Sequence, residues 1–365
     1  MKKVLLMNQQ GVPYEVSPAR YQLVHELKRE GYKTYVFNLG KILHDKNWKD
    51  IDCFINTMNI SKREIRKKIM EIMPEYLIAT TDDDVRIIFP LLVVMKTTFI
   101  YYNLEIYTPE REQRRYENKS AFWYSLSWRM GYLKNKIKEV IFTKKCKFFI
   151  IQDSLRKRIS KKYFIYHSNT LLLPNSYVYN EADCVRSECR GVVYSGNLTR
   201  DRIESMIKKL YSIPNFSIVF SGRSDMWFRN QFKILHSINP GVIFKEQSLS
   251  PQKHLEFLKQ FAVGFVWYDH SEDENEENIG MASGKLFRHL SIGQPVIVSA
   301  SPGLAKIVSE YKIGIVIKDI SELAKAYEKI MSNYSQYQDN VRQIYKKKFD
   351  YAQNIKKFLK KNTGE

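Results

Sequence analysis

A lysine follows a loop of small residues at the expected start of a helix in the second half of the chain. The loop covers residues 280–284, and Lys285 comes directly after it. Exposed amide groups at a helix N-terminus attract an anion, and a lysine at that place adds a formal positive charge. Ser283, Gly284 and Lys285 therefore predict a phosphate site. Gly293 and Pro295 predict that the helix ends just before a buried strand.

A second candidate phosphate site follows the strand expected at 191–196. Gly196 ends this strand, and Arg200 and Arg202 come shortly afterwards. In doubly wound sheets, ligands bind beyond the carboxyl ends of the strands. A glycine there lets the backbone approach a phosphate, and the two arginines would neutralise it. The alternative is a plain turn between a strand and a helix.

Both segments resemble parts of the GT-B glycosyltransferases, especially family 4 and its relatives. Residues 285–298, KLFRHLSIGQPVIV, resemble the donor-binding pattern K-L-F-E-Y-hydrophobic-x-x-G-x-P-V-I. Residues 193–198 resemble the hydrophobic-x-G-R-L turn, with Arg202 at the usual lysine position, and residues 218–222 resemble the L-x-I-V-G strand. The first half, through Gly11, Gly31 and residues 173–176, is similar only at the level of the fold.

The resemblance implies sugar transfer from a nucleotide-sugar by two Rossmann-like, doubly wound α/β domains that face a cleft. It implies no metal, because helix amides and basic side chains neutralise the diphosphate in such folds. It implies no bound cofactor, because the nucleotide-sugar is a substrate. Lys285 and Arg202 would then stabilise the charge that develops on the departing diphosphate. The other implied donor-binding residues are Gly196, Asn197, Arg200, Gly222, Glu277, Ser283, Gly284, Leu286 and Arg288.

Two positions depart from the family pattern. Arg288 replaces the usual glutamate, whose carboxylate accepts hydrogen bonds from the ribose, and an arginine side chain has no acceptor. Glu276 or Glu277 in the upstream acidic run is a substitute acceptor, or part of a solvated loop. Asn197 replaces the usual arginine. These departures favour one alternative, a non-catalytic GT-B subunit that binds a partner enzyme or glycan. A nucleotide-sugar epimerase, which shares the architecture, is the other alternative.

Three features of the first half are candidates for the acceptor side. Glu105 follows the strand expected at 98–102, where a carboxylate acts as a general base or contacts the acceptor. Gln10 and Gly11 lie in the loop after the first strand. Asp83 lies in a run of three aspartates at 82–84, which matches a metal-binding D-x-D pattern but also suits a helix start.

The charge of the chain favours an anionic partner. It has 59 basic and 39 acidic residues among 365, a net charge of +20. Residues 111–162 alone hold 16 basic and 4 acidic residues together with Trp123, Tyr124 and Trp128. Cations mixed with these aromatic residues suit a membrane headgroup layer. A solvated helix face and a nucleic-acid surface are the alternatives, but no nucleic-acid-binding signature accompanies the charge.

We therefore expect a cytoplasmic enzyme at the inner face of a bacterial cell membrane. Its acceptor would be a glycan or a polyprenyl- or lipid-linked sugar, in the synthesis of a surface polysaccharide, lipopolysaccharide or glycolipid. The cysteines Cys53, Cys146, Cys184 and Cys189 form no CxxC pair, so we expect reduced thiols and no zinc site.

Strand and helix patterns alternate along the whole chain, which predicts parallel sheets. We expect an acceptor-binding domain at 1–178, a linker at 179–190 and a nucleotide-sugar-binding domain at 191–342. Residues 343–365 would form a helix that crosses back to the first domain.

Overall fold

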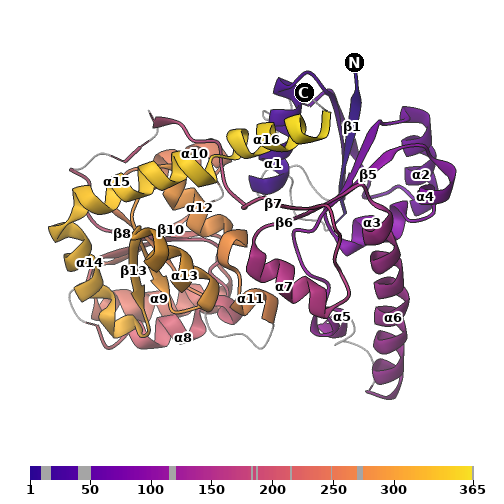
Figure 1. Cartoon of the computed structure of the whole chain (residues 1–365). Coiled ribbons are helices and arrows are strands. Elements are labelled where there is room, and N and C mark those ends of the chain that lie inside the picture. Colours follow the sequence, from indigo (N-terminus) through magenta and orange to yellow (C-terminus); the bar gives the residue numbers. More distant parts are fainter. Residues whose placement is uncertain are drawn as a thin grey trace. The chain divides into compact units, whose positions relative to one another are not determined.

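The computed structural model of the protein describes residues 1–9, 18–39, 51–114, 121–181, 184–185, 188–213, 216–247, 249–268 and 274–363. The chain forms two compact units, drawn in Figure 1. The first comprises Met1–Pro174 and Ile355–Glu365, and the second comprises Asn175–Asn354. Within the described residues, no helix has both the length and the apolar character needed to span a bilayer.

The first unit contains a seven-stranded parallel sheet in the order β3-β2-β1-β4-β5-β6-β7. The β-branched and aromatic residues of these strands are largely buried, as expected for a parallel sheet covered on both faces. The strands are β1 (Lys3–Asn8), β2 (Lys33–Asn38), β3 (Cys53–Asn56), β4 (Tyr76–Ala79), β5 (Thr98–Tyr102), β6 (Phe148–Ile151) and β7 (Thr170–Leu172).

Helices connect the strands of the first unit. Side chains of α2, α3 and α6 pack into one core cluster with the sheet, and Figure 1 shows these helices together on one side of it. The helices are α1 (Pro18–Arg29), α2 (Lys62–Ile72), α3 (Asp82–Ile88), α4 (Leu91–Val94), α5 (Pro109–Arg114), α6 (Ala121–Lys145) and α7 (Ser154–Lys162).

The second unit contains a six-stranded parallel sheet in the order β10-β9-β8-β11-β12-β13. Val192 and Tyr194 of β8 belong to one core cluster and Val193 to another, so successive side chains enter opposite faces of the sheet. The strands are β8 (Val192–Ser195), β9 (Ile218–Gly222), β10 (Val242–Glu246), β11 (Val263–Val266), β12 (Val296–Ser299) and β13 (Gly314–Ile317).

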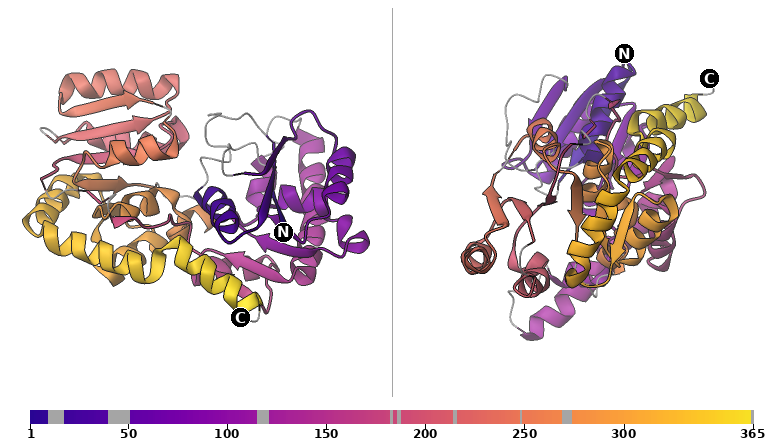
Figure 2. Two further views of the ribbon diagram at one scale, coloured as in Figure 1. Left: turned by 90° about the horizontal axis from the view of Figure 1, so that it is seen from above. Right: turned by 90° about the vertical axis from the view of Figure 1, so that its left-hand side faces the viewer.

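Helices cover both faces of the second sheet, as Figure 2 shows. They are α8 (Arg200–Leu210), α9 (Met226–Ile238), α10 (Pro251–Leu258), α11 (Glu274–Glu277), α12 (Gly284–Ser291), α13 (Pro302–Tyr311), α14 (Leu323–Ser332) and α15 (Tyr334–Ile344). The helix α16 (Tyr351–Thr363) begins in the second unit, and its residues from Ile355 onward are grouped with the first.

The strand order reverses once in each sheet. In the first unit the chain proceeds outward from β1 to β3 and then returns to place β4 on the other side of β1. In the second unit the same reversal places β11 beside β8. Ligands of doubly wound sheets bind at the carboxyl ends of the two strands that flank such a reversal. The topology therefore marks the ends of β8 and β11 as the place to look for a ligand site.

The expected α/β architecture with two doubly wound sheets is confirmed. The sequence analysis did not predict α7 or α9. Both helices have an aspartate N-cap, since the Asp153 side chain accepts from the Arg156 amide and the Asp225 side chain accepts from the Phe228 amide. Residues 175–181, where we placed the end of the first domain and the beginning of the linker, are grouped with the second unit.

His289 of α12 packs directly against the backbone of β11. A Cβ atom built at Gly264 would lie 2.4 Å from Cγ of His289, so only glycine fits there. The His289 Nδ1 atom lies 2.6 Å from Oε1 of Gln294, which makes Nδ1 the donor. Burial lowers the pKa of His289 to about 4, and the ring is therefore neutral at pH 7.

We expect Gly264→Ala to destabilise the protein by about 1–3 kcal/mol, because the new methyl group overpacks a buried site. Urea unfolding measures this change. His289→Ala removes the ring that the methyl group meets, so the double variant should lose less stability than the sum of the two single variants. Strictly additive losses would show that the contact between β11 and α12 does not limit this position.

Candidate functional site

The candidate site of the second unit is built around the first turn of α12. A short 3₁₀ helix, Gly280–Ala282, precedes it, and Ser283 is the N-cap. The buried Ser283 Oγ accepts a hydrogen bond from the Leu286 amide at 3.2 Å, which stabilises the helix start. Because α12 begins immediately after this cap, Lys285 lies in its first turn.

Asn175 holds the loop that precedes this cap. Its backbone amide donates to the Met281 carbonyl at 2.9 Å, and its side-chain Nδ2 donates to the Ala282 carbonyl at 3.1 Å. These two bonds join residues more than 100 positions apart in the sequence. Asn175 is therefore a positioning residue for the loop, and the Pro-Asn pair at 174–175 is the sequence signal that accompanies it.

Lys285 lies where the order of the strands reverses. Its Nζ atom donates to the Tyr194 hydroxyl of β8 at 2.8 Å. The same atom lies 4.7 Å from the ring centroids of both Tyr194 and Tyr268, the latter shortly after β11. Aromatic faces attract a cation. The two rings and the Tyr194 hydroxyl therefore hold the ammonium group beside the ends of β8 and β11.

Two glycines allow the loops after β8 and β9 to approach each other and Lys285. A Cβ atom at Gly196 would lie 2.7 Å from Cε of Lys285. A Cβ atom at Gly222, which has φ +148°, would lie 1.8 Å from the Gly196 carbonyl oxygen. The backbone at Gly196 and Gly222 is therefore not covered by a side chain of its own. A phosphate site needs such uncovered backbone, because the phosphate must come close to the amide groups.

Four further polar side chains lie at the same edge and were not singled out from the sequence. His254 Nε2 of α10 lies 2.5 Å from Oγ of Ser195, and Gln247 Nε2 donates to Oγ of Ser221 at 2.6 Å. Burial lowers the pKa of His254 to about 2, so the ring remains neutral. His254 and Ser195 are 59 positions apart, and no local pattern indicates their pairing.

Several predicted donor residues have other roles in the structure. Leu286 is fully buried in a core cluster, and its amide is bonded to Ser283, so we assign it to packing. Arg200 is exposed and forms an ion pair with Glu204 at 2.9 Å along α8. Arg288 Nε donates to the Tyr177 hydroxyl at 3.1 Å. The donor contacts predicted for Leu286, Arg200 and Arg288 stay predictions.

The remaining donor candidates are Asn197, Glu277 and Arg202. Asn197 is exposed, and Glu277 is half-buried with its backbone carbonyl accepting from Oγ of Ser301 at 2.7 Å. The side chains of Arg202 and Glu276 lie outside the described part of the structure. The roles predicted for Asn197, Arg202 and Glu277 stay predictions.

In the first unit, the three aspartates at 82–84 begin α3. Thr81 is the N-cap and forms a capping box with Asp84. The buried Asp84 carboxylate accepts from the Gln9 amide at 2.8 Å and from the Thr80 amide at 2.7 Å, and it thereby ties the end of β1 to the end of β4. Asp82 and Asp83 form ion pairs with Arg86 at 2.7 and 3.4 Å. The helix-start interpretation therefore accounts for all three carboxylates.

Among the described residues, no group of three or more His, Cys, Asp or Glu side chains has an arrangement that would hold a metal ion. Glu105 is exposed in the segment after β5. Gln10 and Gly11, which we predicted on the acceptor side, lie outside the described residues. The roles predicted for Glu105 and Asp83 at the acceptor stay predictions.

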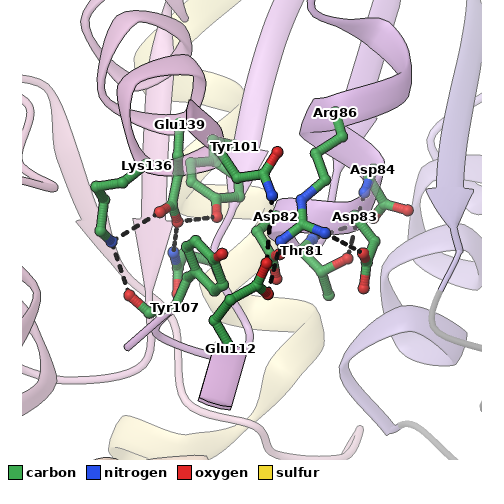
Figure 3. Close-up of polar contacts among 12 residues, drawn as sticks. Thr81, Asp82, Asp83, Asp84, Arg86, Tyr101, Tyr107, Glu112, Lys136 and Glu139 are labelled. Atoms are coloured by element: carbon green, nitrogen blue, oxygen red, sulfur yellow. Dashed lines mark hydrogen bonds and ion pairs between the residues drawn. The ribbon is translucent and has the colours of Figure 1, made fainter. Parts of the chain in front are cut away.

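A buried network of charged residues lies next to these aspartates (Figure 3). Arg86 also contacts Glu112 at 3.4 Å. Lys136 of α6 donates to Glu139 at 2.9 Å and to the Tyr107 carbonyl at 2.7 Å. The other oxygen of Glu139 accepts from the Tyr101 hydroxyl at 2.6 Å. Burial raises the pKa of Glu139, and the neighbouring Lys136 opposes this shift.

We expect Lys136→Met to destabilise the protein by about 3–5 kcal/mol, because it leaves the buried Glu139 without its cation. The double variant Lys136→Met/Glu139→Gln should recover much of this loss, since no unpaired charge remains in the interior. Urea unfolding of the three variants tests the expectation. If the double variant is as unstable as Lys136→Met, the pair does not act as a unit.

Part of the sequence and the fold of the whole chain are similar to known proteins. Residues 192–361 match the model of the glucosyltransferase 3-like C-terminal domain. No curated protein sequence matches the chain. HepE from Anabaena, solved in complex with UDP and glucose, superposes with a TM-score of 0.72 at 12% identity, with 100% of each chain covered.

Two further solved structures are similar over nearly the whole chain. Sucrose-phosphate synthase from Thermosynechococcus elongatus has a TM-score of 0.69 at 14% identity, with 100% of each chain covered. WaaG, a glycosyltransferase involved in lipopolysaccharide biosynthesis, has a TM-score of 0.68 at 13% identity, covering 99% of this chain and 100% of its own. The resemblance to GT-B glycosyltransferases is thus confirmed at the level of the fold, and residues 192–361 are similar to the glucosyltransferase 3-like C-terminal domain.

Proposed function

We propose that the protein transfers a sugar from a nucleotide-sugar to a glycan or lipid-linked acceptor, in the synthesis of a bacterial surface polysaccharide, lipopolysaccharide or glycolipid. One observation carries the proposal. The Lys285 ammonium group lies where the strand order of the second unit reverses, and Tyr194 and Tyr268 hold it there. Gly196, which has no side chain, lies beside it. The match of this unit to a glucosyltransferase domain supports the same conclusion.

Lys285 would act on the leaving group. When the sugar departs, negative charge develops on the nucleoside diphosphate, and a fixed cation lowers the free energy of that state. The amide groups of the first turn of α12 form the positive end of the helix dipole, and they would donate hydrogen bonds to the phosphate oxygens. This arrangement supplies positive charge from the chain itself, and we propose that transfer needs no metal. Arg202 is proposed as a second cation.

A uridine nucleotide is the first donor to test. Solved structures of HepE, whose fold this chain shares, contain UDP-glucose or UDP. The neutral ring of His254, the hydroxyl of Tyr268 and the amide of Gln247 lie near the carboxyl ends of the strands, where hydrogen-bonding groups that select a base or sugar would be needed. We therefore propose UDP-glucose as the reference donor.

We further propose that Glu105 serves the acceptor hydroxyl as a base or a contact, and that Gln10, Gly11 and Asp83 belong to the acceptor side. Their position after strands of the first sheet supports this part of the proposal. We propose the cytoplasmic face of the cell membrane as the place of the reaction, because residues 111–162 carry a large excess of positive charge.

A second candidate function is a GT-B subunit that binds a partner or glycan without catalysis. The hydrogen bond from Arg288 to Tyr177 favours it, because the usual carboxylate for the ribose is replaced by a donor that is already engaged with a hydroxyl group. Consumption of a nucleotide-sugar by the purified protein would rule out this candidate.

We expect Lys285→Met to weaken UDP binding by about tenfold to a hundredfold, which corresponds to the 1.5–3 kcal/mol of a hydrogen bond to a charged group. Isothermal titration calorimetry measures the affinity, and release of UDP from UDP-glucose measures turnover. Lys233→Met, at an exposed position of α9, is the matched control and should bind UDP like the parent protein. Equal affinity for UDP in the Lys285 and Lys233 variants would refute the assignment of Lys285 to the phosphate.

A further inference from the structure

Part of α6 departs from the usual order of a surface helix, because two charged side chains lie inward while four aliphatic side chains lie outward. Its side chains Lys136, Glu139 and Thr143 are buried in the interior of the first unit. Met130, Leu133, Ile137 and Ile141 are exposed, with 64%, 61%, 51% and 39% of their surface accessible. This inversion means that burial within the first unit does not account for the aliphatic residues of the helix.

The buried charges determine which side of α6 is exposed. Figure 3 shows Lys136 and Glu139 directed toward Tyr101 and Tyr107, in the same region as Arg86 and Glu112. Turning the helix about its axis would break the contact of Lys136 with Glu139 and Tyr107 and would leave charges in the interior, which is costly. The exposure of the aliphatic side chains is therefore a consequence of strong inward contacts.

The exposed aliphatic side chains form one continuous stripe. Met130, Leu133, Ile137 and Ile141 are separated by three, four and four positions, and such spacing places side chains on one face of a helix. The stripe is about 16 Å long at 1.5 Å of rise per residue. Aliphatic residues scattered singly over a surface are ordinary, but a contiguous apolar patch marks a contact with another phase or molecule.

Only cations accompany this stripe along α6. Arg129, Lys134, Lys144 and Lys145 are exposed and Lys138 is half-buried, whereas Glu139, the one acidic residue of the helix, is buried inward. Burial lowers the pKa of Lys138, and so do the neighbouring cations Lys134, Arg86, Lys62 and Arg66. Lys62 and Arg66 belong to α2, so two helices bring positive charge to the same place.

We infer that the outward face of α6, with the stripe and its flanking lysines, docks onto a bilayer that contains anionic lipid. The aliphatic side chains would enter the boundary between headgroups and acyl chains, while the lysines reach the phosphates. Charge complementarity favours this occupant, because α6 has four exposed basic groups, one half-buried basic group and no exposed acidic group between Arg129 and Lys145. A protein partner of mixed charge would not find matching groups on this face.

This inference narrows the membrane contact that we proposed for residues 111–162 to one face of one helix, and it rests on that part of the proposed function alone. The donor site lies on the second unit and does not enter the argument. Vesicle binding and UDP binding are therefore measured separately, and either can fail while the other holds.

The test is flotation of the full chain with vesicles of phosphatidylcholine and phosphatidylglycerol, compared with vesicles of phosphatidylcholine alone. We expect binding to the anionic vesicles only, decreasing as salt is added. Lys134→Gln/Lys138→Gln should weaken binding by about fivefold for each charge removed. Leu133→Ser/Ile137→Ser should weaken it by about tenfold or more, since apolar area no longer enters the membrane.

Ile234→Ser/Ile238→Ser on α9 is the matched control. These two side chains are exposed by 51% and 55%, close to the values of the α6 stripe, but they lie on the second unit. The control variant should bind vesicles like the parent, and all variants should unfold at the parent's urea midpoint. Unchanged vesicle binding by the Leu133/Ile137 variant would overturn the inference. So would concentration-dependent self-association that this variant abolishes while the parent ignores vesicles, because the stripe would then be an interface between copies of the chain.

Discussion

The candidate site depends on the direct contact between the backbones of two loops, with no side chain between them. The backbone of Gly222 touches the carbonyl of Gly196, and the Gly196 amide in turn donates to the Ser221 carbonyl at 3.0 Å. The loops continue side by side, since the Leu198 amide donates to the Arg223 carbonyl at 2.8 Å. Because Gly196 has no Cβ atom, the Lys285 side chain passes close to it, and the ammonium group contacts the Tyr194 hydroxyl of β8.

Local patterns in the sequence were sufficient to predict the fold and the start of the site. Alternating strand and helix signals predicted two parallel sheets, and the small residues before Lys285 predicted a helix start with a cation in its first turn. The partners of Lys285 were not predictable in this way. Tyr194 and Tyr268 are 74 positions apart, and only the pairing of β8 with β11 brings them together. Arg200 was a reasonable phosphate candidate by spacing, but Glu204 one helical turn later forms an ion pair with it on the surface of α8.

The buried charges of the first unit show a different limit of sequence patterns. In α6 the apolar residues lie on two faces, with Phe142 inside and Leu133 and Ile137 outside, so periodicity alone does not reveal which face is buried. The answer depends on Glu139 and Lys136, whose partners Tyr101 and Tyr107 come from an earlier part of the chain. The aspartate run at 82–84 likewise matches a metal-binding pattern, but Asp82 and Asp83 pair with Arg86, in the next turn of α3.

The contact between Gly196 and Gly222 also means that substitutions at the two glycines have different consequences. A Cβ atom at Gly196 meets the end of the Lys285 side chain, whereas a Cβ atom at Gly222 meets a carbonyl oxygen of the main chain. No second substitution can remove a main-chain atom, so a change at Gly222 has no simple compensating partner. Directed evolution of this protein would therefore leave Gly222 unchanged.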